Sequence, residues 1–306
     1  MPHIPGFRLQ RRLGAGARAV VYQAIQDQTE RVVALKVLDP TEPLDVGPTQ
    51  DGIHERAITT ALRHRNLARI YAQGEYDGRQ WLASEYLAGG SLAECIGRGL
   101  STTRTLAVLV DLTRGLGHAH QHGIVHGDVK PANVLFRGRR CQGDAVLVDF
   151  GSARQMQDGE LQAGGGTPAY MSPEQARGEA LDARADLYSL GILLREMLTG
   201  HVPADTRDLK VSSLPVSVRW LQPLLDTLLA PEPGDRPDSA EALLDLLANL
   251  LQAAPEAARL EDPAGWIERF LCPHVATATS WTQSRWFWLL VVSGVGLLVL
   301  MWWVLG

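Results

Sequence analysis

The chain has 306 residues, of which 45% are hydrophobic and 21% are charged. This composition excludes a disordered or low-complexity chain and allows one large domain or two small ones. The formal net charge of −5 gives no indication of nucleic-acid binding. The three cysteines, Cys95, Cys141 and Cys272, are too few and too scattered for a disulfide framework, so we expect a reducing compartment.

The first part of the chain, residues 7–83, predicts strands with one helix. FRLQRRL and VVYQAIQ alternate apolar and polar residues, and RVVALKVL is a β-branched run. The turn between the first two contains Gly14 and Gly16, which let backbone N–H groups approach a phosphate. Such a turn alone is usually only a hairpin, and the strand that follows it argues against a dinucleotide-binding motif, which needs a helix there.

Lys36 stands among apolar residues in the third strand, and it is one of only three lysines among 29 basic residues. It is either an edge-strand cation that faces solvent or a cation that reaches the same phosphates. A proline- and glycine-rich stretch follows and predicts a loop. The next segment, ERAITTALRHR, has the apolar spacing of a helix.

Residues 91–251 predict mostly helices. TLAVLVDLTRGLGHAHQHG, DARADLYSLGILLREMLTG and SAEALLDLLANLLQ all have helical apolar spacing. The first two segments end at Gly123 and Gly200, and glycine is a common helix stop. The third begins after Asp238 or Ser239, either of which can cap a helix.

The last part of the chain differs from the rest. Residues 252–285 are rich in Ala, Pro and Thr and are interpreted as a juxtamembrane linker. Residues 286–305 carry no charge and have tryptophans near both ends, and as a helix they would span roughly 30 Å, the thickness of a bilayer core. The first ten residues have no apolar stretch, so we expect no signal peptide. These features predict a single-pass inner-membrane protein that contacts lipid through its C-terminal helix, with the remainder in the cytoplasm.

Residues 125–151 carry the most specific pattern, VHGDVKPANVLF followed by VLVDFG. The spacing of Asp128, Lys130, Asn133 and Asp149 resembles the catalytic loop and Asp-Phe-Gly motif of eukaryotic-type protein kinases. Further on, GTPAYMSPE resembles the substrate-docking segment and Ala-Pro-Glu motif of that family, and DLYSLG and GDRP follow in family order. The compact, arginine-rich chain looks like a bacterial member.

The resemblance implies an α+β chain with the two-lobed protein kinase fold over residues 7–251. The β-rich N-lobe would cover 7–83, the hinge 84–90 and the mainly helical C-lobe 91–251. One C-terminal transmembrane helix would follow the linker.

The resemblance also implies roles for individual residues. Asp128 would orient the substrate hydroxyl and accept its proton, and Lys130 would neutralise charge on the moving phosphoryl group. Asn133 and Asp149 supply hard oxygen ligands that suit Mg²⁺, with Mn²⁺ as an alternative. The resemblance thus implies a site for ATP and a divalent cation.

The remaining catalytic and nucleotide-binding residues follow from the same resemblance. Lys36 would hold the α and β phosphates of ATP, paired with Glu55 on the helix of the N-lobe. Residues of the glycine-rich turn, the neighbouring strands, the hinge and the cavity floor would contact the nucleotide, namely Leu13, Gly14, Ala15, Gly16, Val21, Ala34, Glu85, Leu87 and Leu135.

Three structural roles are also implied. Glu174 and Arg236 would form a buried ion pair. Asp186 would brace the catalytic loop. Thr167 would be a positioning hydroxyl, hydrogen-bonded to the catalytic aspartate and lysine.

Three departures from the family pattern stand out. Ala19 replaces the third glycine of the turn, and Thr59 stands where an apolar residue is usual. Gly127 replaces the arginine that reads a phosphate on the activation segment. Residues 153–166 contain no Ser, Thr or Tyr, so both the phosphate-binding arginine and a site for phosphorylation are absent. We therefore expect a kinase that is not activated by phosphorylation of that segment.

The activity implied is transfer of the γ-phosphoryl group of ATP to Ser or Thr hydroxyls of protein substrates. A small-molecule phosphotransferase is one alternative, because His-Gly-Asp followed by Asn133 also resembles the brace of aminoglycoside-type enzymes. Lys130 and the 166–174 segment favour a protein kinase. A membrane-tethered pseudokinase is the other alternative, which Ala19 and Thr59 keep open. The sequence indicates neither the oligomeric state nor the physiological substrate.

Overall fold

The computed structural model describes residues 2–16, 19–38, 62–150, 153–155, 166–202 and 214–254. The chain divides into two units, Met1–Leu246 and Leu247–Gly306, and the candidate site lies within the first. Most of the predicted helix that carries Glu55 and Thr59 lies outside the described residues, and its last residues, 62–65, are not helical in the structure.

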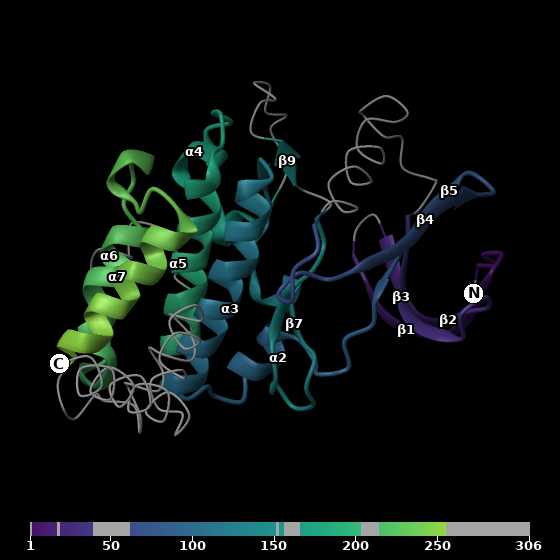
Figure 1. The fold of residues 1–306 in the computed structure, drawn as a ribbon, viewed down its shortest axis with the longest axis horizontal. Helices are drawn as coiled ribbons and strands as arrows, with labels where there is room; N and C mark the ends of the chain where they lie inside the picture. The colour runs from purple at the N-terminus through teal and green to yellow at the C-terminus, as the bar shows by residue number, and fades with distance from the viewer. Residues whose placement is uncertain are drawn as a thin grey trace, which may run out of the picture. The chain divides into compact units, whose positions relative to one another are not determined.

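Five strands form one antiparallel sheet near the N-terminus (Figure 1). Their order in the sheet is β1-β2-β3-β5-β4, and the register of β1 on β2 shifts between Leu9 and Arg11 and again between Arg12 and Gly14. The strands are β1 (Phe7–Ala15), β2 (Ala19–Gln26), β3 (Arg31–Leu38), β4 (Ile70–Tyr76) and β5 (Arg79–Glu85).

The alternation of β3 divides its side chains between two faces. Val33, Leu35 and Val37 are buried in the core of the sheet. Because successive side chains of a strand point to opposite faces, Ala34 and Lys36 lie on the other face, which borders a cavity. The sequence left two alternatives for Lys36, and the structure places it on the side that borders the cavity.

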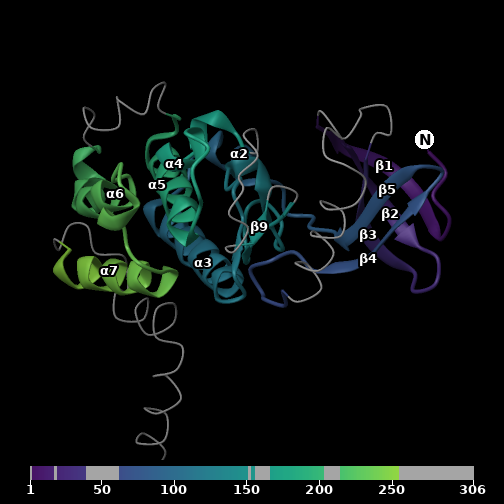
Figure 2. The ribbon, with the colours of Figure 1, turned by 90° about the horizontal axis from the view of Figure 1, so that it is seen from above.

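The chain after β5 is mainly helical, as the family resemblance implies. Figure 2 shows α3 packed alongside α5. The elements are α2 (Leu92–Ile96), α3 (Thr102–Gln121), β6 (Ile124–Val125), β7 (Val134–Phe136), β8 (Ala145–Leu147), β9 (Arg154–Gln155), α4 (Pro173–Ala176), α5 (Ala183–Thr199), α6 (Gln222–Leu228) and α7 (Ala240–Ala253).

The helix ends follow local chemistry. The side chain of Ser101 caps α3 by accepting the N–H of Arg104, and α5 ends at Gly200, whose φ of +77° is the left-handed conformation that favours glycine. Ser239 accepts the N–H of Ala242 at 3.2 Å and so caps α7. The predicted stop at Gly200 and start at Ser239 are confirmed.

No helix in the part of the chain that the structure describes is both long and apolar enough to cross a membrane. The segment predicted to do so, 286–305, lies outside that part. Helix α7 continues to Ala253, past the domain boundary predicted at residue 251.

Two of the cysteines are joined by a disulfide. Cys95 in α2 is bonded to Cys141 in the loop between β7 and β8, with 6.0 Å between their Cα atoms. The cysteines were predicted to be too few and too scattered for a disulfide framework, and that prediction did not include this single bond. The two bonded cysteines are 46 residues apart, and only the packing of the β7–β8 hairpin beside α2 brings them together. The third cysteine, Cys272, lies outside the described residues.

A buried ion pair joins α4 to the segment before α7, as the sequence predicts. Nη1 and Nη2 of Arg236 donate to the two carboxylate oxygens of Glu174 at 2.6 and 2.8 Å. Both residues are buried, and Arg236 also donates to the backbone carbonyls of Arg184, Ala230 and Pro231. Each nitrogen of this guanidinium therefore donates to at least one acceptor, which is the condition under which a buried charge is tolerated.

We expect Glu174→Gln to lower the free energy of unfolding by about 3–5 kcal/mol, because it leaves the Arg236 charge buried without its counter-ion. Urea unfolding followed by circular dichroism measures the change. Arg177→Gln is the matched control, since it breaks the exposed pair with Glu179, and surface pairs contribute little. Equal effects of the two substitutions would contradict the assignment.

Candidate active site

A single buried carboxylate holds the loop that follows β6. The side chain of Asp186, in α5, is fully buried, and it accepts the backbone N–H groups of His126 and Gly127 at 2.8 and 2.9 Å. Nε2 of His120, in α3, lies 2.8 Å from the same carboxylate. Burial alone would raise the pKa of Asp186, but these contacts hold it below its usual range. The predicted bracing role of Asp186 is confirmed.

Gly127 suits this loop because of its backbone conformation. Its φ of +74° lies in the left-handed region, which glycine adopts at little cost. Its carbonyl accepts a hydrogen bond from Nε2 of Gln175 at 2.7 Å. The glycine that departs from the family pattern therefore removes a basic side chain while keeping the loop in place.

Asp128 lies at the centre of a hydrogen-bonded group. Nζ of Lys130 lies 2.6 Å from Oδ2 of Asp128 and donates to Oγ1 of Thr167 at 2.7 Å. Thr167 donates to Oδ1 of Asp128 at 2.9 Å, and Nδ2 of Asn133 donates to Oδ2 at 3.0 Å. Thr167 thus bonds both predicted partners. Donors on both oxygens fix the carboxylate, while 12% of the side chain stays exposed to an incoming group.

Asn133 and Asp149 border the same cavity and together fit a divalent cation. The amide nitrogen of Asn133 is engaged with the backbone carbonyl and carboxylate of Asp128, so its amide oxygen is the atom available to a cation. An amide oxygen and a carboxylate are hard donors of the kind that Mg²⁺ prefers. The described residues hold no cluster of three or more His, Cys, Asp or Glu side chains that could hold a metal alone. Substrate phosphates would therefore complete the coordination.

Asp149 and Lys36 meet across this site. Nζ of Lys36 lies 2.5 Å from Oδ1 of Asp149. Asp149 has a φ of +65°, an uncommon conformation for a residue with a side chain, and such positions concentrate at functional sites. Glu55, the predicted partner of Lys36, lies outside the described residues, so that pairing stays a prediction.

A cavity of about 650 Å³ lies between the sheet and the loop that carries Asn133. Most residues predicted to contact the nucleotide border it, namely Leu13, Gly14, Val21, Ala34, Lys36, Glu85, Leu87 and Leu135. Ala15, the last residue of β1, and Gly16, which follows it, do not border the cavity. Asp128 and Lys130 also lie outside its lining.

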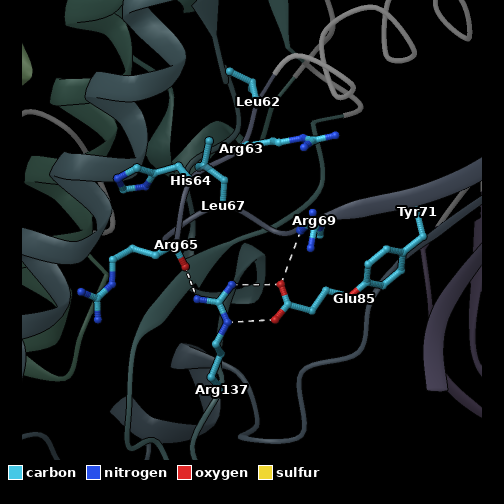
Figure 3. Close-up of a pocket in the computed structure, with 9 residues that line it drawn as sticks. All are labelled: Leu62, Arg63, His64, Arg65, Leu67, Arg69, Tyr71, Glu85 and Arg137. Carbon is cyan, nitrogen blue, oxygen red and sulfur yellow. Dashed lines mark hydrogen bonds and ion pairs between the residues drawn. The ribbon is translucent and has the colours of Figure 1, made fainter. Parts of the chain in front are cut away.

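The hinge residue Glu85 has a second role that the sequence does not indicate. Figure 3 shows Arg137 facing Glu85, and the guanidinium donates to both carboxylate oxygens at 2.8 and 2.9 Å. Burial alone would raise the pKa of Glu85, but the bonds from Arg137 hold it below its usual range. The two residues are 52 positions apart, and no local pattern marks such a pair. It ties the hinge to the end of β7.

Comparison with known proteins identifies the family. A model described as "Protein kinase domain" matches residues 7–261. The chain belongs to the protein kinase family.

Its relatives include bacterial proteins named as serine/threonine-protein kinases. The chain is 37% identical over 204 residues to PknJ of Mycobacterium tuberculosis, a match that covers 65% of this chain and 34% of PknJ. It is 34% identical over 264 residues to pkn3 of Myxococcus xanthus, covering 77% of this chain and 48% of that protein. This kinase thus spans about a third to a half of the length of these relatives.

Solved structures agree with this family and with the two-lobed fold. The crystal structure of a double mutant of the Mycobacterium tuberculosis PknI kinase domain matches with a TM-score of 0.67 and 28% identity. That match covers 81% of this chain and 97% of the PknI domain.

We expect Thr167→Val to lower kcat about ten- to hundredfold, because it removes a hydroxyl that bonds two charged side chains. The KM for ATP should change little, since Thr167 does not border the nucleotide cavity. Thr167→Ser, which keeps the hydroxyl, is the control. Steady-state kinetics on a protein substrate measures both constants, and loss of activity in Thr167→Ser as well would refute the role of the hydroxyl.

Proposed function

We propose that this chain transfers the γ-phosphoryl group of ATP to Ser or Thr hydroxyls of protein substrates. The observation that carries the proposal is the group formed by Asp128, Lys130 and Thr167, in which one exposed carboxylate edge is held beside one ammonium group. Phosphoryl transfer requires mainly positioning and charge neutralisation, and this group provides both.

The residues of the chain would act as follows. Asp128 accepts the proton of the acceptor hydroxyl at its carboxylate as the new P–O bond forms. Lys130 stabilises the negative charge on the moving phosphoryl group. Lys36 binds the phosphates that do not move. Thr167 holds the side chains of Asp128 and Lys130 in position through its two hydrogen bonds.

Asn133 and Asp149 would hold Mg²⁺, or Mn²⁺ in its place. The ion would neutralise phosphate charge when bound. Asn133 also donates to Asp128 at 3.0 Å, so one side chain links the ion site to the proton acceptor. A substitution at Asn133 would therefore disturb both.

This kinase would not require phosphorylation of its activation segment. The arginine that reads such a phosphate in the family is replaced by Gly127, and residues 153–166 offer no acceptor hydroxyl. Thr167 has a hydroxyl, but that hydroxyl already bonds Asp128 and Lys130. The contacts that join Asp128, Lys130 and Thr167 form without an added phosphate.

The kinase domain would lie at the cytoplasmic face of the inner membrane. Residues 286–305 form an uncharged run with tryptophans near both ends, which is typical of a membrane-spanning helix. Substrates would then be proteins at or near that membrane.

The catalytic proposal predicts that Asp128→Asn lowers the transfer rate by about 10²- to 10⁴-fold, because the amide cannot accept the proton. The assay uses the full chain in detergent with labelled ATP, Mg²⁺ and a generic protein substrate, followed by phosphoamino-acid analysis. Phosphoserine or phosphothreonine that is lost in the variant is the expected result. Transfer only to aminoglycosides would indicate the small-molecule enzyme, and nucleotide binding without transfer would indicate the pseudokinase.

The membrane proposal predicts that the full chain sediments with inner membranes and resists extraction by carbonate, whereas a chain lacking residues 286–305 is released. Western blotting of the fractions measures the distribution. The kinase domain should be digested by protease only after the cytoplasmic side is opened. A full chain found in the soluble fraction would refute the anchor.

A further inference from the structure

The disulfide between Cys95 and Cys141 lies next to residues that border the nucleotide cavity. Cys95 belongs to α2, which begins directly after the hinge and packs beside β7 (Figure 1). Gly90, Ser91 and Glu94, before and within α2, border the cavity. The bond therefore joins a wall of this cavity to the loop that follows β7.

Backbone hydrogen bonds connect the same two parts. The N–H of Gly89 donates to the carbonyl of Phe136 at 2.9 Å, and the N–H of Phe136 donates to Gly90 at 3.2 Å. The N–H of Cys141 donates to Gly89 at 3.2 Å. A Cβ atom at Gly89 would lie 2.1 Å from the carbonyl oxygen of Gly138, so the hinge and the hairpin are in direct backbone contact. A shift of the hairpin would therefore move the hinge.

The turn that holds Cys141 is strained. Arg140 and Cys141 have φ of +54° and +65°, and Gln142 donates its N–H to the carbonyl of Arg139 at 3.3 Å. This is a two-residue turn with both central residues left-handed, where Asn-Gly is the favoured pair. Such conformations persist only where the surroundings hold them. The disulfide is the covalent part of that restraint.

The sulfur of Cys95 would also have a hydrogen-bond acceptor in the reduced state. It lies 3.0 Å from the carbonyl oxygen of Ser91, to which a thiol can donate. Cys95 is only 1% exposed, whereas Cys141 is half-buried. Disulfide exchange requires access to the sulfur that attacks. Cys141 is thus the accessible member of the pair.

We propose that Cys95 and Cys141 form a reversible thiol–disulfide switch that controls nucleotide affinity, with small-molecule disulfides as the oxidant. This inference rests on the proposed function only in that the cavity binds ATP. The oxidised form holds the strained turn and the cavity wall and binds the nucleotide more tightly. The reduced form lets the turn relax and binds it more weakly. A reversible bond agrees with a reducing compartment, where disulfides are usually transient.

The exchange proceeds in two steps. The thiolate of Cys141 attacks one sulfur of the external disulfide, forms a mixed disulfide and releases one thiolate, which takes up a proton. The thiol of Cys95 then loses its proton to solvent and attacks the sulfur of Cys141, which releases the second thiol. Two electrons pass from the cysteine pair to the external disulfide, and two small thiols are formed.

The test equilibrates the full chain, in detergent, with mixtures of reduced and oxidised glutathione. Differential alkylation and peptide mass spectrometry give the fraction of Cys95–Cys141 disulfide. The Kd of a fluorescent ATP analogue with Mg²⁺ is measured on the same samples. We expect the Kd to fall about fivefold or more as the disulfide forms, the usual size of a coupling between two sites. The wild-type chain alone gives this result, so the test does not depend on a variant folding.

Cys141→Ser should hold the Kd at the reduced value in every mixture, and Cys272→Ser is the control that should keep the redox response. A Kd that is the same in both states, or a disulfide that no glutathione mixture forms or reduces, would overturn the switch and leave the kinase proposal intact. Failure of both states to bind the analogue would overturn the nucleotide site itself, and with it the control of affinity.

Discussion

The catalytic loop depends on the buried carboxylate of Asp186. Two successive backbone N–H groups, from His126 and Gly127, converge on it from a loop that has few other ways to satisfy them. A buried anion is costly unless it is hydrogen-bonded, and a buried N–H is costly unless it meets an acceptor. The carboxylate and the two N–H groups therefore satisfy one another. The position of the next residue, Asp128, is fixed as a result.

Asp128 is held by hydrogen bonds in the same way as the loop before it. Oδ1 of Asp128 accepts a hydrogen bond from Thr167, and Oδ2 accepts one from Asn133. The donors come from different segments of the chain, so the two oxygens differ in their surroundings. Because Thr167 accepts from Lys130 and donates to Asp128, the direction of both bonds is set by chemistry. Gly127 shows why the missing arginine does no harm to this geometry, since its left-handed backbone suits glycine. What the substitution changes is charge, because glycine stands where the family has a basic side chain.

The sequence predicted those features that lie in short, ordered patterns. The β-branched run indicated strand β3, and the glycine at the end of α5 marked its stop, because both signals are local. Glu85 and Arg137, and likewise Cys95 and Cys141, could not be predicted, since each pair is made by the packing of the β7–β8 hairpin against the hinge region. Long-range pairs of this kind leave no periodicity in one sequence. The family resemblance supplied Glu174 and Arg236, which composition and spacing alone would also have missed.

Two kinds of restraint hold different parts of the site, namely hydrogen bonds around Asp128 and a disulfide near the nucleotide cavity. Asp128 is held by hydrogen bonds from Thr167 and Asn133, on a loop that the buried Asp186 anchors, and none of these contacts involves a cysteine. The outer wall of the nucleotide cavity is fixed by backbone contacts at Gly89 and by one covalent bond that thiol exchange can open. The disulfide is therefore a separate restraint from the hydrogen bonds of Asp128, although Asn133 both borders the cavity and bonds Asp128. A signal that acts on the bond at Cys141 would change how often the cavity is filled while leaving Asp128 in its place.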